Sequence, residues 1–184
     1  MPRLNDFLTH INLDPLICYC REHGDEVAYA KGERLAQEGE ICRYMGIVLK
    51  GYFKYTSLNS KGEECVTGFS FKDEVVTDYV RSFLFNQPSL TSIIAGSDAV
   101  VLQVRIADIR KYLLSHNPDF LAKSATILLH EAYSRYLSLH ILTPAERYAE
   151  LCHRYHDVIS DIPYQEIASY LAISRRQFQR IRSN

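Results

Sequence analysis

The spacing of hydrophobic and polar residues changes along the chain and divides it into zones. In residues 4–21 the apolar positions recur at helical intervals, and Pro15 is placed to begin a second short helix. In residues 27–104 apolar residues come in short or alternating runs, separated by turn residues such as Lys31-Gly32 and Glu38-Gly39. Many short strands at close intervals predict a small β-sandwich or barrel.

Two features stand out inside the strand zone. The stretch GYFKYTSLNSKGEECVTGFSF predicts a β-hairpin with the polar tip Asn59-Ser60-Lys61-Gly62. The following residues, 71–86, interrupt the strand pattern, and we expect them to be partly helical.

Residues 118–142 predict one long helix, because they are rich in Leu and Ala and contain no Pro or Gly after Pro118. Asn117 is the expected N-cap. One set of positions recurs in steps of four and three, as in a coiled-coil dimer seam: Leu121, Ala125, Leu128, Ala132, Arg135, Leu139 and Leu142. Apolar residues such as Tyr133 and Leu137 lie off this seam. The helix therefore packs on the barrel, on a second copy, or on both.

The last 42 residues predict three short helices. Thr143, Pro144 and Glu146 form an N-cap, a first helical residue and a capping box. After the connector DVISDIP, the segment YQEIASYLA is helical, AIS forms a tight turn, and Ser174 caps the final helix. Two short helices joined by a tight turn, the second of them basic, are typical of a helix-turn-helix unit.

The residue types suit such a unit. Ala168 is small where the helices approach most closely, Ile173 fills the turn, and Phe178 and Ile181 face inward. The outer face of the last helix carries the candidate base contacts Arg175, Arg176, Gln177, Gln179 and Arg180. Arginine and glutamine pair with guanine and adenine in the major groove. Candidate phosphate contacts are Arg182, Tyr164 and Gln165.

A run of charge is more often a solvated face than a binding site. Here the inward positions also fit, which favours DNA binding. Two such units related by a dyad read a palindromic duplex, so we expect a homodimer on palindromic double-stranded DNA.

Composition excludes several other classes. The 184 residues include 47% hydrophobic and 23% charged residues with a net charge of -1, as in ordinary globular proteins. The sequence has neither a secretory signal nor an apolar run of membrane length, so we expect a soluble, cytoplasmic protein. The five cysteines are irregularly spaced, and we expect free thiols.

The order of barrel, long helix, TPAER and helix-turn-helix resembles the family of the cyclic-AMP receptor protein and the fumarate–nitrate reduction regulator (Crp/Fnr), over nearly the whole chain. TPAERY and IASYLAISRRQFQRIR are the most specific segments. The resemblance implies an α+β fold, with a double-stranded β-helix (a cyclic-nucleotide-binding-like jelly roll) in residues 1–117. A dimerisation helix in residues 118–142 and a DNA-binding helix-turn-helix in residues 143–184 follow. Transcription regulation through RNA polymerase is also implied.

The chain departs from the family pattern in the effector pocket. Asp78, Tyr79 and Val80 stand where cyclic-nucleotide-binding members have Gly-Glu-Leu, and Ser89 stands where they have an arginine. A carboxylate without its counter-charge repels a phosphate, so we expect an effector other than cyclic AMP. The candidate pocket comprises Asp78, Tyr79, Val80, Arg81, Ser89, Leu90 and Thr91. Arg81 and Arg105 are either ligands of another anion or surface arginines.

Other departures concern cofactors and the reader of DNA. Cys18 and Cys20 do not supply the cysteine set of an iron–sulfur cluster, and no metal or cofactor is expected. His130 and His140 are either haem ligands or ordinary core or surface histidines.

In the helix-turn-helix, Arg176 replaces a base-reading glutamate of the family, so the preferred operator should differ. Ala172 replaces the usual turn glycine, at a cost of about 1 kcal/mol. The connector is too short for a β-hairpin wing and nothing follows Asn184, so we expect a wingless unit.

Two alternatives come from other classes. A barrel enzyme of the cupin kind needs histidine ligands inside the barrel, but the chain has none between His23 and His116. We therefore expect no enzymatic activity. The other alternative is an effector-sensing or interaction protein whose DNA reader has decayed, which Ala172 and the missing wing favour.

Overall fold

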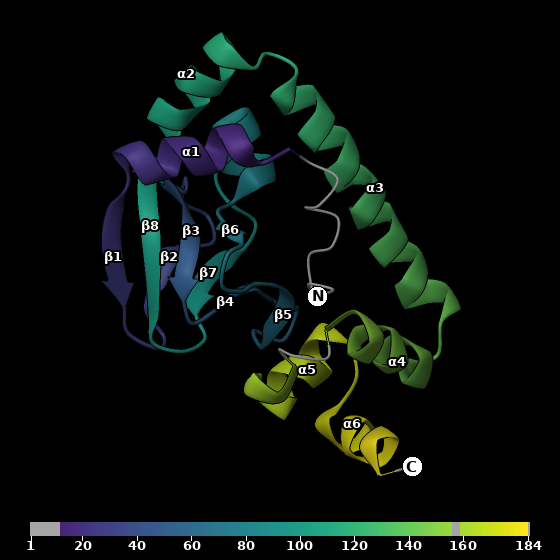
Figure 1. The fold of residues 1–184 in the computed structure, drawn as a ribbon. Helices are drawn as coiled ribbons and strands as arrows, with labels where there is room; N and C mark the ends of the chain where they lie inside the picture. Colours follow the sequence, from purple (N-terminus) through teal and green to yellow (C-terminus); the bar gives the residue numbers. More distant parts are fainter. Residues whose placement is uncertain (1–11, 156–158, 184) are drawn as a thin grey trace.

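A computed structural model describes residues 12–155 and 159–183 (Figure 1). The predicted helical spacing in residues 4–11 lies outside this part. The first described helix, α1 (Asp14–His23), has a proline in its first turn, as the sequence predicts.

Eight antiparallel strands in the described part of the chain build the β-roll that follows α1. Their bounds are β1 Asp25–Tyr29, β2 Arg34–Ala36, β3 Tyr44–Lys50, β4 Phe53–Leu58, β5 Glu64–Ser70, β6 Val75–Val76, β7 Ser92–Ala95 and β8 Ala99–Arg105. They form one sheet in the order β1-β8-β3-β6 and a second in the order β2-β7-β4-β5. This crossed order confirms the predicted jelly roll. Alternate side chains of both sheets point inward, which is why the sequence alternates.

The segment between β6 and β7 contains a π-helix, η2 (Tyr79–Leu84), and this confirms the partly helical interruption. Among the described residues, six further helical elements follow the roll. They are α2 Ile106–His116, α3 Phe120–Ile141, α4 Pro144–Tyr155, η3 Ile159–Asp161, α5 Tyr164–Tyr170 and α6 Arg175–Arg182.

The start of the long helix differs from the sequence prediction. Asn117 is not its N-cap but the C-cap of α2, where the Asn117 amide donates to the Leu113 carbonyl. The pattern alone had left α2 unassigned. The residue before α3 is Asp119, and its side chain makes no capping hydrogen bond. Only residues 117–119 connect the end of α2 to the start of α3.

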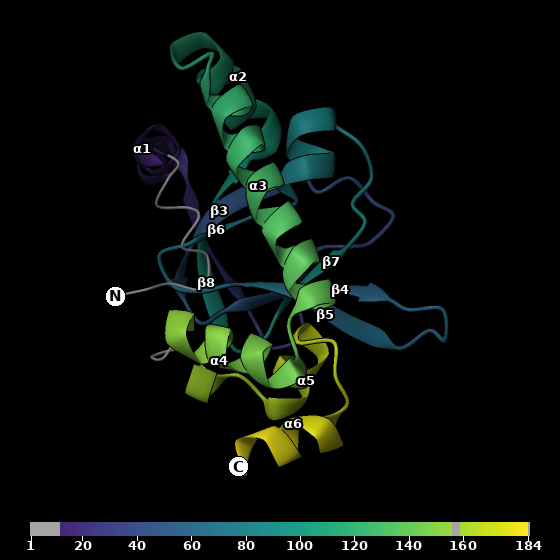
Figure 2. The same ribbon diagram turned by 90° about the vertical axis from the view of Figure 1, so that its right-hand side faces the viewer.

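The described residues form two hydrophobic cores. The larger lies inside the roll, around Phe53 and Ile93, and extends under α1 and α2 at the upper end of Figure 1. The smaller core joins Tyr52 and Phe69 of the roll to Ile167 and Phe178. Helices α4, α5 and α6, which we call the reader unit, are therefore joined to the roll, with α5 packed against β5 (Figure 2).

None of the helices in the described part of the chain has the length and hydropathy that crossing a membrane requires.

Candidate nucleic-acid interface

The two helices α5 and α6 are joined by a tight turn at Ala172. The Ala172 φ angle is +56°, which lies in the left-handed region. This conformation is the one expected at a turn position where the family usually has glycine. Ile167, Ala168 and Leu171 of α5 are buried against Phe178 of α6. Because Phe178 is fully buried and meets the Tyr148 ring edge-on at 5.0 Å, it fixes α6 against α4.

The outer face of α6 presents its basic and amide side chains to solvent. The exposed residues are Arg175, Arg176, Gln177, Gln179, Arg180 and Arg182. Within residues 12–155 and 159–183, none of these arginines has an ion-pair partner. The positive charge of α6 is therefore available to a ligand.

Gln177 has a structural role that the sequence analysis did not assign. Its side-chain oxygen accepts hydrogen bonds from the Ser174 amide at 2.9 Å and from the Ser174 hydroxyl at 3.0 Å. In return the Ser174 hydroxyl accepts from the Gln177 amide, which completes a capping box. The Gln177 oxygen is thus occupied, and only its amino group is free to meet a base. The sequence indicates this cap, because a serine followed three positions later by a glutamine is the pattern of a capping box.

The predicted phosphate contacts lie on one side of the reader unit. The Arg182 guanidinium stacks on the Tyr164 ring, 4.1 Å from its centroid, and Gln165 is exposed beside Tyr164. The stacking orders a long cationic side chain that otherwise moves freely.

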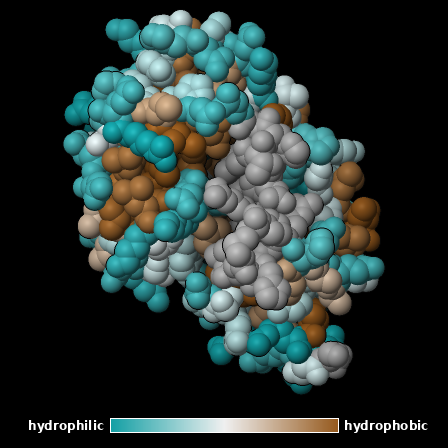
Figure 3. All heavy atoms as spheres, in the orientation of Figure 1, coloured by the Kyte–Doolittle hydropathy of each residue, from teal (hydrophilic) through white to brown (hydrophobic). Residues whose placement is uncertain are grey.

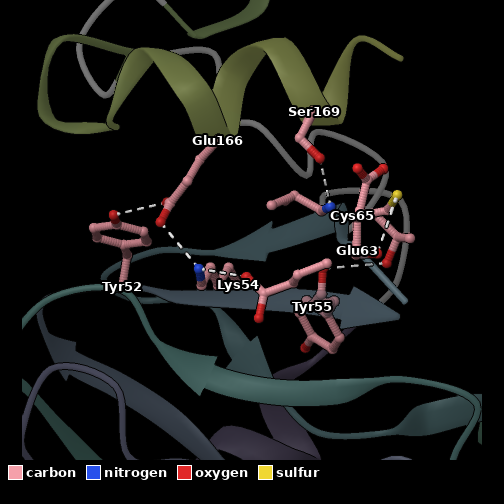
Figure 4. A network of polar contacts seen from close by, with 10 residues as sticks. Tyr52, Lys54, Tyr55, Glu63, Cys65, Glu166 and Ser169 are labelled. Carbon is pink, nitrogen blue, oxygen red and sulfur yellow. Dashed lines mark hydrogen bonds and ion pairs between the residues drawn. The ribbon is translucent and has the colours of Figure 1, made fainter. Parts of the chain in front are cut away.

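A network of polar contacts holds α5 on the roll (Figure 4). The Lys54 ammonium lies 3.1 Å from the Glu166 carboxylate and 2.8 Å from the Glu64 carboxylate. The Tyr52 hydroxyl also donates to Glu166, at 3.1 Å. Sequence patterns offer no signal for this network, since Glu166 is more than 100 residues away from Tyr52 and Lys54.

The edge of the roll adds a further contact. β5 is the outer strand of its sheet, and its Val66 amide donates to the Ser169 hydroxyl of α5 at 2.8 Å. The outer strand of a sheet has backbone amides that no neighbouring strand pairs with. The Ser169 hydroxyl of α5 provides a partner for one of these amides.

The tip of the β4–β5 hairpin lies beside the N-terminal end of α6. A cavity of about 580 Å³ separates them, lined by Glu63 and Glu64 on one side and by Arg175 and Gln177 on the other. Two acidic residues therefore line the cavity beside the end of α6, the end from which a recognition helix contacts bases.

The long helix is tied to the reader unit at two places. The predicted capping box is confirmed: the Thr143 amide donates to Glu146 at 2.8 Å, and the hydrogen bonds from Thr143 lower the pKa of the Glu146 carboxyl. Arg147 donates to the Leu142 carbonyl at 2.9 Å, which closes the end of α3. The Arg135 guanidinium stacks on the Tyr170 ring at 3.5 Å and donates to the Tyr170 carbonyl.

The seam predicted on α3 is not its most exposed apolar face. Leu121 packs against the core of the roll and Arg135 is engaged with Tyr170, because these positions turn toward the chain's own domains. Other seam members are half-buried or, at Ala132 and Leu139, exposed.

One residue further on, a second set of positions with steps of four and three is exposed throughout. We call it the α3 stripe, and it comprises Ala122, Thr126, Leu129, Tyr133, Tyr136 and His140. Leu129 is 72% exposed and Tyr133 is 60% exposed. Hydrophobic residues reach the surface along the right-hand edge of Figure 3, where α3 runs.

The predicted effector residues are only partly brought together. The Asp78 carboxylate is buried and caps η2, accepting from the Ser82 amide at 3.2 Å and the Ser82 hydroxyl at 2.9 Å. The Arg81 guanidinium donates to the Pro88 carbonyl. Tyr79 turns toward α3, where its hydroxyl is hydrogen-bonded to Ser124.

The remaining members of this set divide between interior and solvent. Ser89 is buried and bonds to the Thr91 carbonyl at 2.7 Å. Val80 and Leu90 are 50% and 63% exposed. The Asp78 carboxylate is therefore hydrogen-bonded by its own helix, and it forms no ion pair with a cationic side chain of the described residues.

Comparison with known proteins agrees with this architecture. The family model of the cyclic nucleotide-binding domain matches residues 26–116. No curated protein matches the sequence. FixK2 from Bradyrhizobium japonicum is similar in structure with a TM-score of 0.73 and 20% identity, over 87% of this chain and 83% of FixK2.

Two further solved structures are similar over most of their length. The c-di-GMP responsive global regulator CLP from Xanthomonas campestris has a TM-score of 0.65 and 14% identity, covering 94% of this chain and 90% of CLP. The catabolite activator protein of Thermus thermophilus has a TM-score of 0.58 and 15% identity, covering 96% of this chain and 84% of that protein. Residues 26–116 are thus similar to cyclic nucleotide-binding domains, and the chain as a whole has the fold of the Crp/Fnr regulators.

Proposed function

We propose that the protein is a sequence-specific DNA-binding transcription regulator of the Crp/Fnr type, without enzymatic activity. The observation that carries this proposal is the outer face of α6, where four arginines without ion-pair partners among the described residues stand on a helix fixed from behind by Phe178. Arginines held in this way can contact guanine edges and phosphates.

The dimer is part of the proposal. The α3 stripe is an exposed apolar face with heptad spacing, and a second copy of the same helix supplies the matching surface. Pairing through α3 would place two reader units about a common axis, as a palindromic operator requires. Contact with RNA polymerase follows by likeness to the family.

The effector of this regulator is expected to differ from cyclic AMP. Asp78 caps η2 and Ser89 bonds within its own loop, so neither is arranged around a cyclic phosphate. The candidate pocket residues of the family are used here mainly for internal structure.

The alternative of a decayed reader receives less support from the geometry. A decayed unit has no reason to retain the Ser174–Gln177 capping box or the fully buried Phe178. The left-handed Ala172 costs about 1 kcal/mol, which a packed three-helix unit tolerates.

Selection on a random duplex library, without added ligand, tests the proposal. A two-fold-symmetric motif whose binding weakens with salt is expected. Arg176→Ala should relax base preference at one position in each half-site, at about 1–3 kcal/mol, whereas Arg34→Ala on the distant β2 should not. Enrichment of no motif, even after Glu63→Gln has removed a charge beside α6, would favour the decayed reader.

A further inference from the structure

A second cavity lies at the upper end of the roll, away from the reader unit, and none of the candidate effector residues lines it. It occupies about 690 Å³, a volume typical of small-molecule sites. Its walls come from the start of β3, the segment after η2, and α2. The charged residues that line it are Arg43, Arg105, Arg110 and Lys111, and Asn86 and Ser115 add neutral polar groups.

The charged residues that line this cavity are all cations. None of its four cations has an ion-pair partner among the described residues. Asp108 is the one acidic residue of α2, and it does not line the cavity. Asp108 acts on Tyr19 of α1, where burial and the Asp108 charge raise the pKa of the Tyr19 hydroxyl. Cations gathered without a counter-charge repel one another, and a bound anion relieves that repulsion.

The wall of the cavity is not only charged. Ile41 and Leu114 line it and are 42% and 49% exposed, which is unusual for large aliphatic side chains beside arginines. They offer apolar contact to a ligand that also carries negative charge. A patch made for inorganic ions has no use for such a surface, and a macromolecular partner fits a hollow of this size less well than a small molecule does.

The cavity is also built into the helical frame. Arg110 donates to the Leu84 carbonyl at the end of η2, at 3.0 Å, and the Cys42 amide donates to the Ser82 hydroxyl inside η2. η2 in turn contacts α3 through Tyr79 and Ser124, and α2 runs directly into α3. An occupant of the cavity would therefore contact the elements that position the long helix.

We propose that this basic cavity binds a small organic molecule that carries a phosphate group and an apolar part. The phosphate lies among Arg43, Arg105, Arg110 and Lys111, and the apolar part lies on Ile41 and Leu114. The site is separate from the residues that correspond to the family's nucleotide pocket. It does not depend on the proposed DNA binding.

Calorimetric titration of the full chain with 1-naphthyl phosphate, pyrophosphate and inorganic phosphate at one ionic strength tests the site. Naphthyl phosphate should bind more tightly than inorganic phosphate. Arg105→Gln combined with Lys111→Gln should weaken its binding by about tenfold or more, since charge-assisted hydrogen bonds are lost. Both residues are exposed and without ion pairs in the described part of the chain, so the fold should persist.

Matched variants separate this site from general anion binding. Arg34→Gln with Lys72→Gln removes the same charge at exposed positions outside the cavity, and binding should not change. Leu114→Ser should weaken naphthyl phosphate and leave pyrophosphate unaffected. Absence of binding, equal affinity for naphthyl and inorganic phosphate, or equal loss in both double variants would each overturn the proposal. None of these measurements involves DNA, so their failure is distinct from failure of the proposed function.

Discussion

The ammonium group of Lys54 on β4 lies 3.1 Å from the carboxylate of Glu166 on α5, and this pair joins the roll to the reader unit. Both side chains are nearly buried, at 16% and 15% exposed. The contact is reinforced by Glu64 and by Tyr52, which points toward Glu166 in Figure 4. The position of the reader unit thus depends on contacts between residues that are far apart in the sequence.

Breaking this pair should loosen the reader unit. In a double-mutant cycle with Lys54→Met and Glu166→Gln, we expect a coupling free energy of about 1–3 kcal/mol in chemical denaturation. The exposed Lys123–Asp119 pair of α3, treated in the same way with Lys123→Met and Asp119→Asn, should give about 0.5 kcal/mol or less. Equal coupling in the two cycles would contradict the view that the Lys54 network holds the domains together.

The same pair has a defined pH dependence. Burial lowers the pKa of Lys54, but hydrogen bonds and charges from Glu64 and Glu166 outweigh it, so the pKa is raised. A raised pKa means that the stabilisation is complete below the pKa of the unfolded chain, about 10.4, and is lost as the pH rises through the folded value. The coupling free energy between Lys54 and Glu166, measured by the same double-mutant cycle, should therefore be constant from roughly pH 7 to pH 9.

The carboxylates at the tip of the hairpin should weaken DNA binding. Glu63 lines the cavity that separates the hairpin from Arg175, and a carboxylate there repels phosphates that approach α6. Glu63→Gln should increase DNA affinity in a fluorescence-anisotropy titration, by about two- to tenfold at low salt and less at high salt. Glu26→Gln, an exposed change on the distant strand β1, serves as control. A gain of the same size in the control would indicate only a general change in net charge.

The α3 stripe and the seam predicted from the sequence can be separated by neighbouring substitutions. Tyr133→Glu places a charge on the stripe, whereas Ala132→Glu places the same charge on the predicted seam. Both positions are exposed, so neither change should unfold the chain. In light scattering at micromolar concentration, Tyr133→Glu should produce monomers and Ala132→Glu should remain dimeric. The reverse result would restore the predicted seam, and two dimers would place the interface elsewhere.

The turn of the reader unit carries a strain that a single substitution can relieve. Ala172 has a φ angle of +56°, where glycine is not penalised. Ala172→Gly should therefore raise the free energy of unfolding of the reader unit by about 1 kcal/mol. Ala149→Gly in the middle of α4 should lower it by about the same amount, because there the alanine is in its preferred helical state. Destabilisation by both changes would mean that the left-handed strain is negligible.

Local patterns determined much of this protein. Alternation of apolar residues is a property of neighbouring positions, and it predicts the roll because each strand must bury one face. Capping at Thr143 and Ser174 depends on residues three positions apart, so it too is visible in the sequence. The inward placement of Phe178 follows from helical spacing in the same way.

Only the tertiary structure decided which faces of these elements meet. The Lys54–Glu166 pair spans 112 positions, and the basic cavity joins Arg43 to Lys111. No short-range pattern encodes such distances. The α3 helix is apolar on several faces, so its exposed stripe could be identified only after the roll and Tyr170 had covered Leu121 and Arg135. The sequence determines each element through local energetics, while packing between distant elements selects the surfaces that remain for partners.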